Sequence, residues 1–262
     1  MPGKGLPIHL KPGQRNHDLP DDRKRIQQDF IMNNLQKHIG PLLQNETFEL
    51  SFRQRLPQPV HPKACVVLLH GVGGSEMNLA DLALGIDPDI LVVLPRAPLQ
   101  FALGQFGWFR VAFTANGPSI EENEAEQSRQ TLIRFVEQLQ STYGIVSQNT
   151  VIAGFSQGGI LSASVALSAP ERVAAFAVLS GRILPELAPH MADKAHLANL
   201  RGFIGHGEYD SRLPVMWAQH SDQLLKELGV VHLTRLYPID HGISATMQSD
   251  FLEWLHGLVT AH

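Results

Sequence analysis

The chain has 262 residues, of which 44% are hydrophobic and 18% are charged. This length and composition are typical of a globular protein whose core needs no disulfides, and they argue against a disordered or fibrous chain. A net charge of −4 and a pI near 6.3 provide no basic field for a polyphosphate backbone, so we expect no nucleic-acid partner.

Residues 1–45 are predicted to be a leader to the main domain. The first twenty residues contain prolines, glycines and charges in place of the apolar segment of a secretory signal peptide, and we expect a flexible arm there. A helix is predicted over residues 21–40, with Gly40 at its end. The sequence leaves three roles open for this helix: packing on the domain, covering the site as a lid, or forming a dimer arm. A homodimer is therefore left open as well.

Short β-type runs alternate with helical patterns from residue 46 to the end of the chain. Strands are predicted over residues 47–55, 64–70, 89–95, 150–155, 173–180, 200–206 and 230–238. Helices are predicted over residues 77–85, 157–169, 214–228 and 245–259, and another from a capping box of Ser119 and Glu122 to Gly144. This alternation predicts one α/β domain, residues 46–262, with a mostly parallel sheet and helices on both faces.

Two further features bear on the protein's surroundings. Cys65 is the only cysteine and lies within an apolar run, so no intrachain disulfide can form and a buried thiol is favoured. No stretch approaches the roughly 18 apolar residues that a membrane span needs. We therefore predict a soluble, cytoplasmic protein without a membrane span.

A serine between glycines is the first indication of chemistry. Gly154-Phe155-Ser156-Gln157-Gly158 follows the strand at 150–155 and precedes a predicted helix. The G-x-S-x-G pattern alone is a weak signal, but a strand-turn-helix setting is the one in which a sharp turn raises a nucleophilic serine above a sheet. Glycines two positions on either side are then required because larger side chains would collide in so tight a turn.

A serine nucleophile needs a histidine base and a carboxylate that orients the histidine. Asp210 and His241 each lie just beyond the carboxyl end of a predicted strand, the edge at which open α/β sheets build their sites. Taken singly, either residue is more often incidental. Glu208 and Asp240 are rival acids, but Asp240 adjoins His241 in sequence and would have difficulty reaching the far ring nitrogen. We therefore predict a triad of Ser156, Asp210 and His241.

The same chemistry needs hydrogen-bond donors for a tetrahedral oxyanion. The backbone N–H groups of Val72 and Gln157 are the predicted donors, the first from the glycine-rich stretch that follows the strand at 64–70. His70, at the start of that stretch, is expected to brace the loop rather than to transfer protons.

Several motifs together resemble those of the phospholipase/carboxylesterase family of α/β hydrolases, which includes acyl-protein thioesterases and small bacterial carboxylesterases. In chain order they are LLHGVGG, LPRAP, GWF, GFSQGG, LSG, HGEYDSRLP and DHG, and the similarity covers about residues 60–260. The resemblance implies an α/β-hydrolase fold, and its triad and oxyanion donors fall on the residues named above. No cofactor or metal is expected.

The resemblance also suggests a substrate pocket, and the sequence departs from the thioesterase-like members near it. Trp108, Phe109 and Leu213 are the candidates to line the pocket. Gly74 and Arg110 stand where those members carry acidic residues, which favours a divergent bacterial-type esterase. Arg110 could bind a carboxylate or phosphate if it faces the cleft, although an exposed surface position is the stronger expectation.

The sequence thus predicts a serine hydrolase that cleaves small carboxylic esters through an acyl-enzyme intermediate. Thioesters and lysophospholipids stay open as substrates. A non-catalytic hydrolase-fold protein that binds a small ligand is the main alternative, and a metallohydrolase is disfavoured because no H-E-x-x-H spacing occurs.

Overall fold

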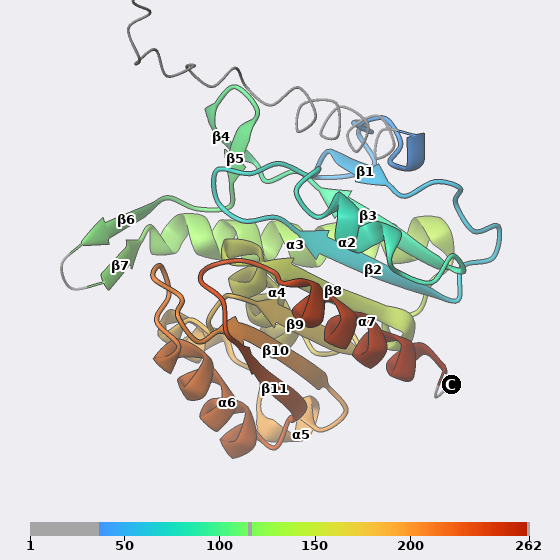
Figure 1. The fold of residues 1–262 in the computed structure, drawn as a ribbon. Coiled ribbons are helices and arrows are strands. Elements are labelled where there is room, and N and C mark those ends of the chain that lie inside the picture. Colours follow the sequence, from blue (N-terminus) through green and yellow to red (C-terminus); the bar gives the residue numbers. More distant parts are fainter. Residues whose placement is uncertain (1–36, 115–116, 261–262) are drawn as a thin grey trace, which may run out of the picture.

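The structure is a computed structural model and describes residues 37–114 and 117–260 (Figure 1). The predicted flexible arm, and all of the predicted helix at 21–40 except its end, lie outside these residues. The last part of the predicted leader contacts the domain, because Ile39 and Leu43 form isolated antiparallel bridges with Arg55 and Phe52.

A seven-stranded sheet forms the centre of the fold, with strand order β1-β3-β2-β8-β9-β10-β11. Its strands are β1 (Phe52–Gln54), β2 (Ala64–Leu69), β3 (Ile90–Pro95), β8 (Thr150–Phe155), β9 (Ala175–Leu179), β10 (Arg201–Gly207) and β11 (Val231–Tyr237). Only β1 runs antiparallel to its neighbour, and every other pairing in the sheet is parallel. The predicted α/β class and mostly parallel sheet are confirmed, although β1 is shorter than the run predicted for it.

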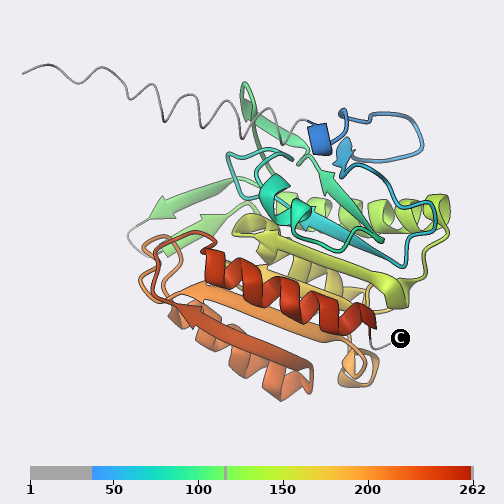
Figure 2. The same cartoon turned by 45° about the vertical axis from the view of Figure 1, so that its right-hand side comes forward.

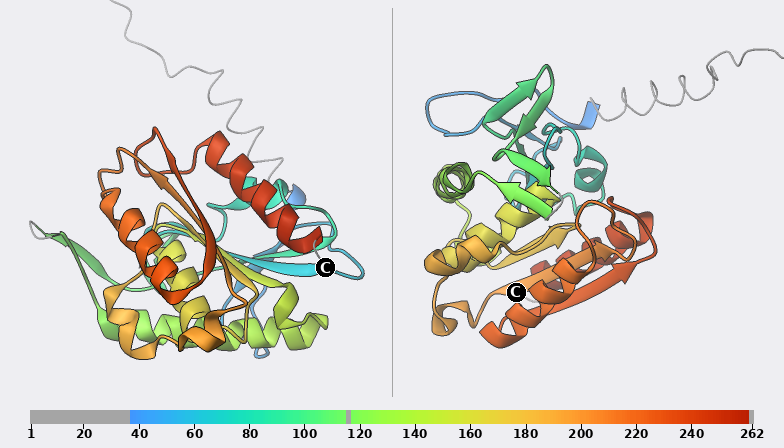
Figure 3. Two further views of the ribbon diagram at one scale, coloured as in Figure 1. Left: turned by 90° about the horizontal axis from the view of Figure 1, so that it is seen from below. Right: turned by 90° about the vertical axis from the view of Figure 1, so that its left-hand side faces the viewer.

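Helices cover both faces of this sheet (Figures 2 and 3). The helices are α2 (Ala80–Leu84), α3 (Glu122–Tyr143), α4 (Gln157–Ser168), α5 (Lys194–Leu197), α6 (Met216–Leu228) and α7 (Ala245–Thr260). Buried residues of α3, α4 and α6 form one apolar cluster with the sheet, and those of α2 and α7 form another. Strands β2, β3 and β9 are buried along their whole length because helices lie on both sides, which explains their uninterrupted apolar sequences.

Two hairpins between β3 and α3 depart from the sequence prediction. One consists of β4 (Leu99–Ala102) and β5 (Gln105–Gly107), the other of β6 (Val111–Thr114) and β7 (Gly117–Ile120). The second hairpin places Ser119 in a strand opposite Ala112, so the predicted capping box with Glu122 is wrong. The predicted end of α3 at Gly144 is confirmed, because this glycine adopts the left-handed conformation with φ of 65°.

Cys65 is buried in β2, as predicted, and burial raises the pKa of its thiol to about 12. Among the described helices, none combines the length and the apolar character needed to cross a membrane.

Candidate active site

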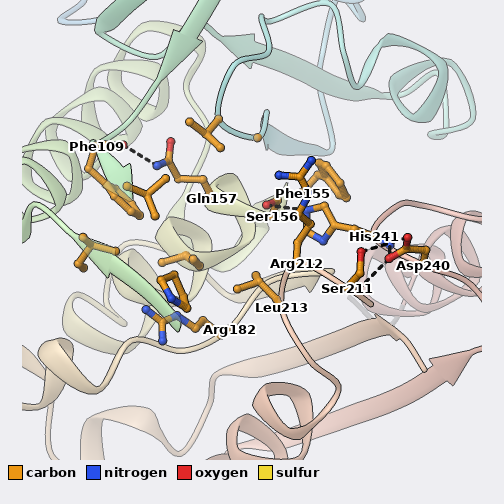
Figure 4. Close-up of a pocket in the computed structure, with 16 residues that line it drawn as sticks. Phe109, Phe155, Ser156, Gln157, Arg182, Ser211, Arg212, Leu213, Asp240 and His241 are labelled. Atoms are coloured by element: carbon orange, nitrogen blue, oxygen red, sulfur yellow. Dashed lines mark hydrogen bonds between the residues drawn. The ribbon is translucent and has the colours of Figure 1, made fainter. Parts of the chain in front are cut away.

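Three polar side chains meet at the carboxyl edge of the sheet. Ser156 follows β8, Asp210 lies three residues beyond β10, and His241 lies in the segment after β11. These strands are parallel, so their carboxyl ends open on the same edge and their following loops converge there. Figure 4 shows the side chains of Ser156 and His241 next to each other at the wall of a cavity.

The turn that carries Ser156 is sharp. Ser156 has φ of 53° and ψ of −115°, a strained backbone conformation for a residue with a side chain, immediately before the first residue of α4. A Cβ atom at Gly158 would lie 2.0 Å from the carbonyl oxygen of Leu69, and one at Gly154 would lie 2.4 Å from the carbonyl carbon of Gly158. The spacing of glycines around the serine therefore has the steric cause expected from the sequence.

The imidazole of His241 lies between the serine and the aspartate. Its Nε2 is 3.0 Å from Ser156 Oγ and its Nδ1 is 2.8 Å from Asp210 Oδ2. Because a carboxylate accepts only, Nδ1 carries the proton that it donates to Asp210, and Nε2 is left to accept from the serine hydroxyl. This arrangement can take a proton from Ser156 as its oxygen attacks.

Asp210 is held in one orientation by groups on both of its oxygens. Oδ1 accepts the backbone N–H groups of Arg212 and Leu213 at 2.9 and 2.8 Å, while Oδ2 faces His241. Asp210 is buried, and His206 Nε2 lies 3.4 Å from Oδ2 while donating to Leu213 O at 2.8 Å. Burial lowers the pKa of His206, which favours a neutral ring beneath the aspartate.

The two rival acids take other positions. Asp240 accepts the backbone N–H groups of Ser211 and His241, as well as the Ser211 hydroxyl, so its carboxylate holds the loop rather than the imidazole. Glu208 is exposed. Of the three candidate carboxylates, Asp210 alone meets the His241 ring.

Two backbone N–H groups border the space next to Ser156. Gln157 is the first residue of α4, so its N–H has no carbonyl of a preceding helical turn to bond. Val72 lies on the rim of the cavity, and within the described parts of the chain its N–H makes no hydrogen bond. Both groups are therefore candidates to bind a substrate oxygen, as the donors of an oxyanion hole do.

The side chain of Gln157 has a separate role that the sequence does not reveal. Its Oε1 accepts the backbone N–H of Trp108 at 2.7 Å. Its Nε2 donates to Phe109 O at 2.7 Å, the bond drawn in Figure 4. These bonds tie the serine turn to the segment that begins the β6–β7 hairpin. Another hydrogen bond holds the loop that carries His241. The hydroxyl of Ser180, directly after β9, donates to the carbonyl oxygen of Gly242 at 2.8 Å.

The loop that carries Val72 is braced from within the protein. His70 accepts the Ala97 N–H at Nε2 and bonds Gly71 O through Nδ1, and burial lowers its pKa, in line with the structural role predicted for it. Glu76, 2% exposed, accepts from Arg53 at 2.9 Å and from Arg96 at 2.7 Å. This ionic cluster joins the loop to β1 and to the end of β3.

The Glu76 cluster is expected to make stability depend on pH in the acid range. Burial alone would raise the pKa of Glu76, but the hydrogen bonds from Arg96 and Arg53 outweigh it and hold the pKa at about 2, below the usual 4.5. Because the pKa is lower in the folded chain, the stabilisation is complete above about pH 4.5 and is lost as the pH falls toward 2. We expect Glu76→Gln to reduce the free energy of unfolding at pH 7 by at most about 3 kcal/mol and to flatten its fall below pH 5.

Urea unfolding between pH 7 and pH 3 measures both effects. Glu253→Gln, which removes an exposed carboxylate on α7, is the matched control. Equal pH profiles for the Glu76 variant and the wild type would contradict the expectation.

A cavity of about 440 Å³ opens beside Ser156. Ser156 and His241 border it together with the neighbouring Phe155, and the other apolar side chains that line it are Phe109, Val111, Pro118, Ile120, Ile160 and Leu213. Of the three residues predicted to line a substrate pocket, Phe109 and Leu213 line this cavity. Trp108 does not line the cavity, because it is fully buried behind it and donates its indole N–H to His70 O at 2.9 Å.

The arginines that line the cavity are not the one that the sequence singled out. Arg110 is 65% exposed, pairs with Glu124 and does not line the cavity, which matches the surface position favoured for it. Arg182 and Arg212 do line it, and neither was singled out from the sequence. Arg182 follows β9 by three residues, so its approach to the site depends on the strand order, which no local pattern reports.

A family model shows which protein family the chain belongs to. The model of the family described as phospholipase/carboxylesterase matches residues 57–258. The chain belongs to the phospholipase/carboxylesterase family. This confirms the resemblance seen in the sequence and, at the level of the family, the predicted class of ester-cleaving serine hydrolase.

Relatives and solved structures agree with membership of the phospholipase/carboxylesterase family. Acyl-protein thioesterase 1 of Emericella nidulans is 24% identical over 196 residues, which are 65% of this chain and 79% of that protein. The carboxylesterase of Mesorhizobium loti matches with a TM-score of 0.69 at 24% identity, over 83% of this chain and 98% of that one. The Bacillus cereus carboxylesterase also gives 0.69, at 19% identity over 80% and 95% of the two chains. The predicted α/β-hydrolase fold is thereby confirmed.

Proposed function

We propose that the protein is a carboxylesterase that cleaves small carboxylic esters through a covalent acyl-enzyme, with Ser156 as nucleophile, His241 as general base and Asp210 as its orienting acid. The observation that carries this proposal is the continuous chain of hydrogen bonds from Ser156 Oγ through His241 to Asp210. The strained serine turn and the two N–H groups beside it supply the remaining parts of such a site.

The proposed reaction has two steps, acylation of Ser156 and deacylation by water. Ser156 Oγ attacks the ester carbonyl carbon while His241 Nε2 takes the hydroxyl proton, and the oxyanion is stabilised by the N–H groups of Val72 and Gln157. The tetrahedral intermediate expels the alcohol, which leaves with the proton from His241. Water then loses a proton to His241 and attacks the acyl-serine, and collapse releases the carboxylic acid and returns the proton to Ser156.

The cavity favours a small substrate. Its volume of about 440 Å³ falls within the range of small-molecule sites, about 300–1,000 Å³, and apolar and polar groups share its wall about equally. Thioesters present the same carbonyl to the same nucleophile, and relatives bear the name acyl-protein thioesterase. We place esters first because Gly74 and Arg110 depart from the acidic residues of the thioesterase-like members.

Covalent labelling tests this proposal most directly. A fluorophosphonate probe should modify the purified protein once, on the peptide that contains Ser156, and should abolish hydrolysis of short p-nitrophenyl esters. A panel that crosses acyl lengths with ester, thioester and lysophospholipid leaving groups would rank the substrates. An unlabelled, inactive protein would instead support the alternative of a hydrolase-fold protein that only binds a ligand.

A further inference from the structure

Arg182 is the most unusual side chain of the cavity. It is only 4% exposed and lines the space beside Ser156, although its guanidinium carries a full positive charge. Its Nε is buried without a hydrogen-bond partner in the described structure. Buried charges in proteins are normally paired, because removing a charge from water is costly.

In the described parts of the chain, no carboxylate pairs with this guanidinium at close range. Among residues 37–114 and 117–260, none forms an ion pair with Arg182 within 4.0 Å or accepts a hydrogen bond from its side chain. Glu186 interacts only at longer range and is exposed. Asp240, the acidic residue that lines the same cavity, already accepts N–H groups of Ser211 and His241.

The guanidinium is nevertheless held in place. Its central carbon lies over the Trp217 ring, 4.4 Å from the ring centre, a cation–π contact that uses none of its N–H donors. A planar fork with unused donors, fixed at the wall of a cavity, suits bidentate binding of a carboxylate.

We propose that Arg182 binds a carboxylate on the acyl part of the substrate, so that the preferred substrates are half-esters of dicarboxylic acids. This inference rests on the proposed esterase function and specifies its substrate class. The oxyanion faces the N–H groups of Val72 and Gln157 and the leaving oxygen faces His241 Nε2, so the acyl chain must extend away from His241. In Figure 4, Arg182 lies beyond Leu213 as seen from Ser156 and His241, on that side of the cavity.

Apolar side chains of the cavity suit the methylene spacer of such a substrate. Leu213, Ile160 and Ile120 are apolar and line the cavity together with Arg182. A short chain of methylene groups would contact these side chains while its two ends meet Ser156 and Arg182.

Paired esters test the proposal. Monomethyl esters of dicarboxylic acids with two to six methylene groups are compared with neutral methyl esters of the same length, by methanol release at pH 7. At the best length, the wild type should favour the charged ester by at least about tenfold in kcat/KM, the effect of one hydrogen bond to a charged group. Arg182→Gln should lose about 10- to 100-fold on the charged ester and change by less than about threefold on the neutral one.

Two further variants separate recognition from structure. Arg134→Gln removes an exposed arginine of α3 that pairs with Glu49, and both kinds of ester should be hydrolysed as by the wild type. Arg182→Lys keeps the charge but loses the fork, so it should retain part of the preference. Thermal unfolding of Arg182→Gln should occur at the wild-type temperature or above, because a buried unpaired charge is removed.

The outcomes distinguish the inference from the function beneath it. Hydrolysis of neutral esters without a preference at any length would overturn the role of Arg182 while leaving the esterase intact, and so would equal losses on both esters in Arg182→Gln. Binding is measured separately by calorimetry with the inactive Ser156→Ala protein. That protein should bind the charged half-ester, and adding Arg182→Gln should weaken binding by about 10- to 100-fold. Undiminished binding in the double variant, or none in the single one, would also overturn the proposal.

Discussion

Replacing Ser156 with alanine is expected to lower kcat/KM for short p-nitrophenyl esters by about 10⁵-fold while the protein stays folded. Ser156 is the hydroxyl that bonds His241 Nε2 in the described structure, and its removal leaves that nitrogen without a proton to accept. The fold should tolerate the change, because alanine has a Cβ like serine and faces the same strain at φ of 53°. One hydrogen bond is lost, so the free energy of unfolding should change by about 1 kcal/mol or less.

Ser164→Ala is the matched control for this variant. Ser164 lies on α4, the same helix that Ser156 precedes, and its hydroxyl only donates to Ile160 O at 2.9 Å one turn earlier. Hydrolysis rates should stay within about twofold of the wild type, because a local hydroxyl-to-carbonyl bond in a helix contributes little. If Ser156→Ala kept substantial activity while the control lost none, Ser156 would not be the nucleophile.

Much of the fold could be predicted because buried parallel strands have a clear sequence pattern. Strands β2, β3 and β9 lie between two helical layers, so both faces are apolar and each appears as a short unbroken run. The meeting of Ser156, Asp210 and His241 follows from the same fact. Residues just beyond the carboxyl ends of parallel strands share one edge, whatever their distance along the chain.

The two hairpins escaped prediction because little in them is buried. Most residues of β4 are exposed, so no apolar alternation marks the strand, and β5 has only three residues. The pair Asn116-Gly117 is a hairpin signal that the sequence does contain. Ser119 pairs across this hairpin instead of capping α3, which is why the capping box predicted there is wrong.

Side chains that act across the fold could not be found from local patterns. Gln157 stands in the serine motif, yet its bonds to Trp108 and Phe109 depend on a hairpin that was not foreseen. Arg182 is one arginine in a loop sequence, and only burial against Trp217 and exposure to the cavity make it unusual. Such roles are properties of packing between distant segments.

Asp210→Asn is expected to reduce kcat by about 10⁴-fold with little change in KM. Oδ1 of Asp210 accepts the N–H groups of Arg212 and Leu213, so an asparagine must keep its oxygen there and turn its NH₂ group toward His241. The amide would then donate to His241 Nδ1, which forces the ring proton onto Nε2. A histidine with its proton on Nε2 cannot accept the proton of Ser156, so the base is lost although the geometry is kept.

Steady-state kinetics on a short p-nitrophenyl ester, with circular dichroism to verify folding, measure this effect. Asp240→Asn is the matched comparison, because Asp240 is the other carboxylate near His241 and bonds only its backbone N–H and the Ser211 groups. We expect a loss of less than about tenfold there, since the imidazole keeps its partner and its tautomer. If instead Asp240→Asn were the more damaging change, the carboxylate that orients the base would be Asp240, and the hydrogen bond between His241 and Asp210 would have no catalytic part.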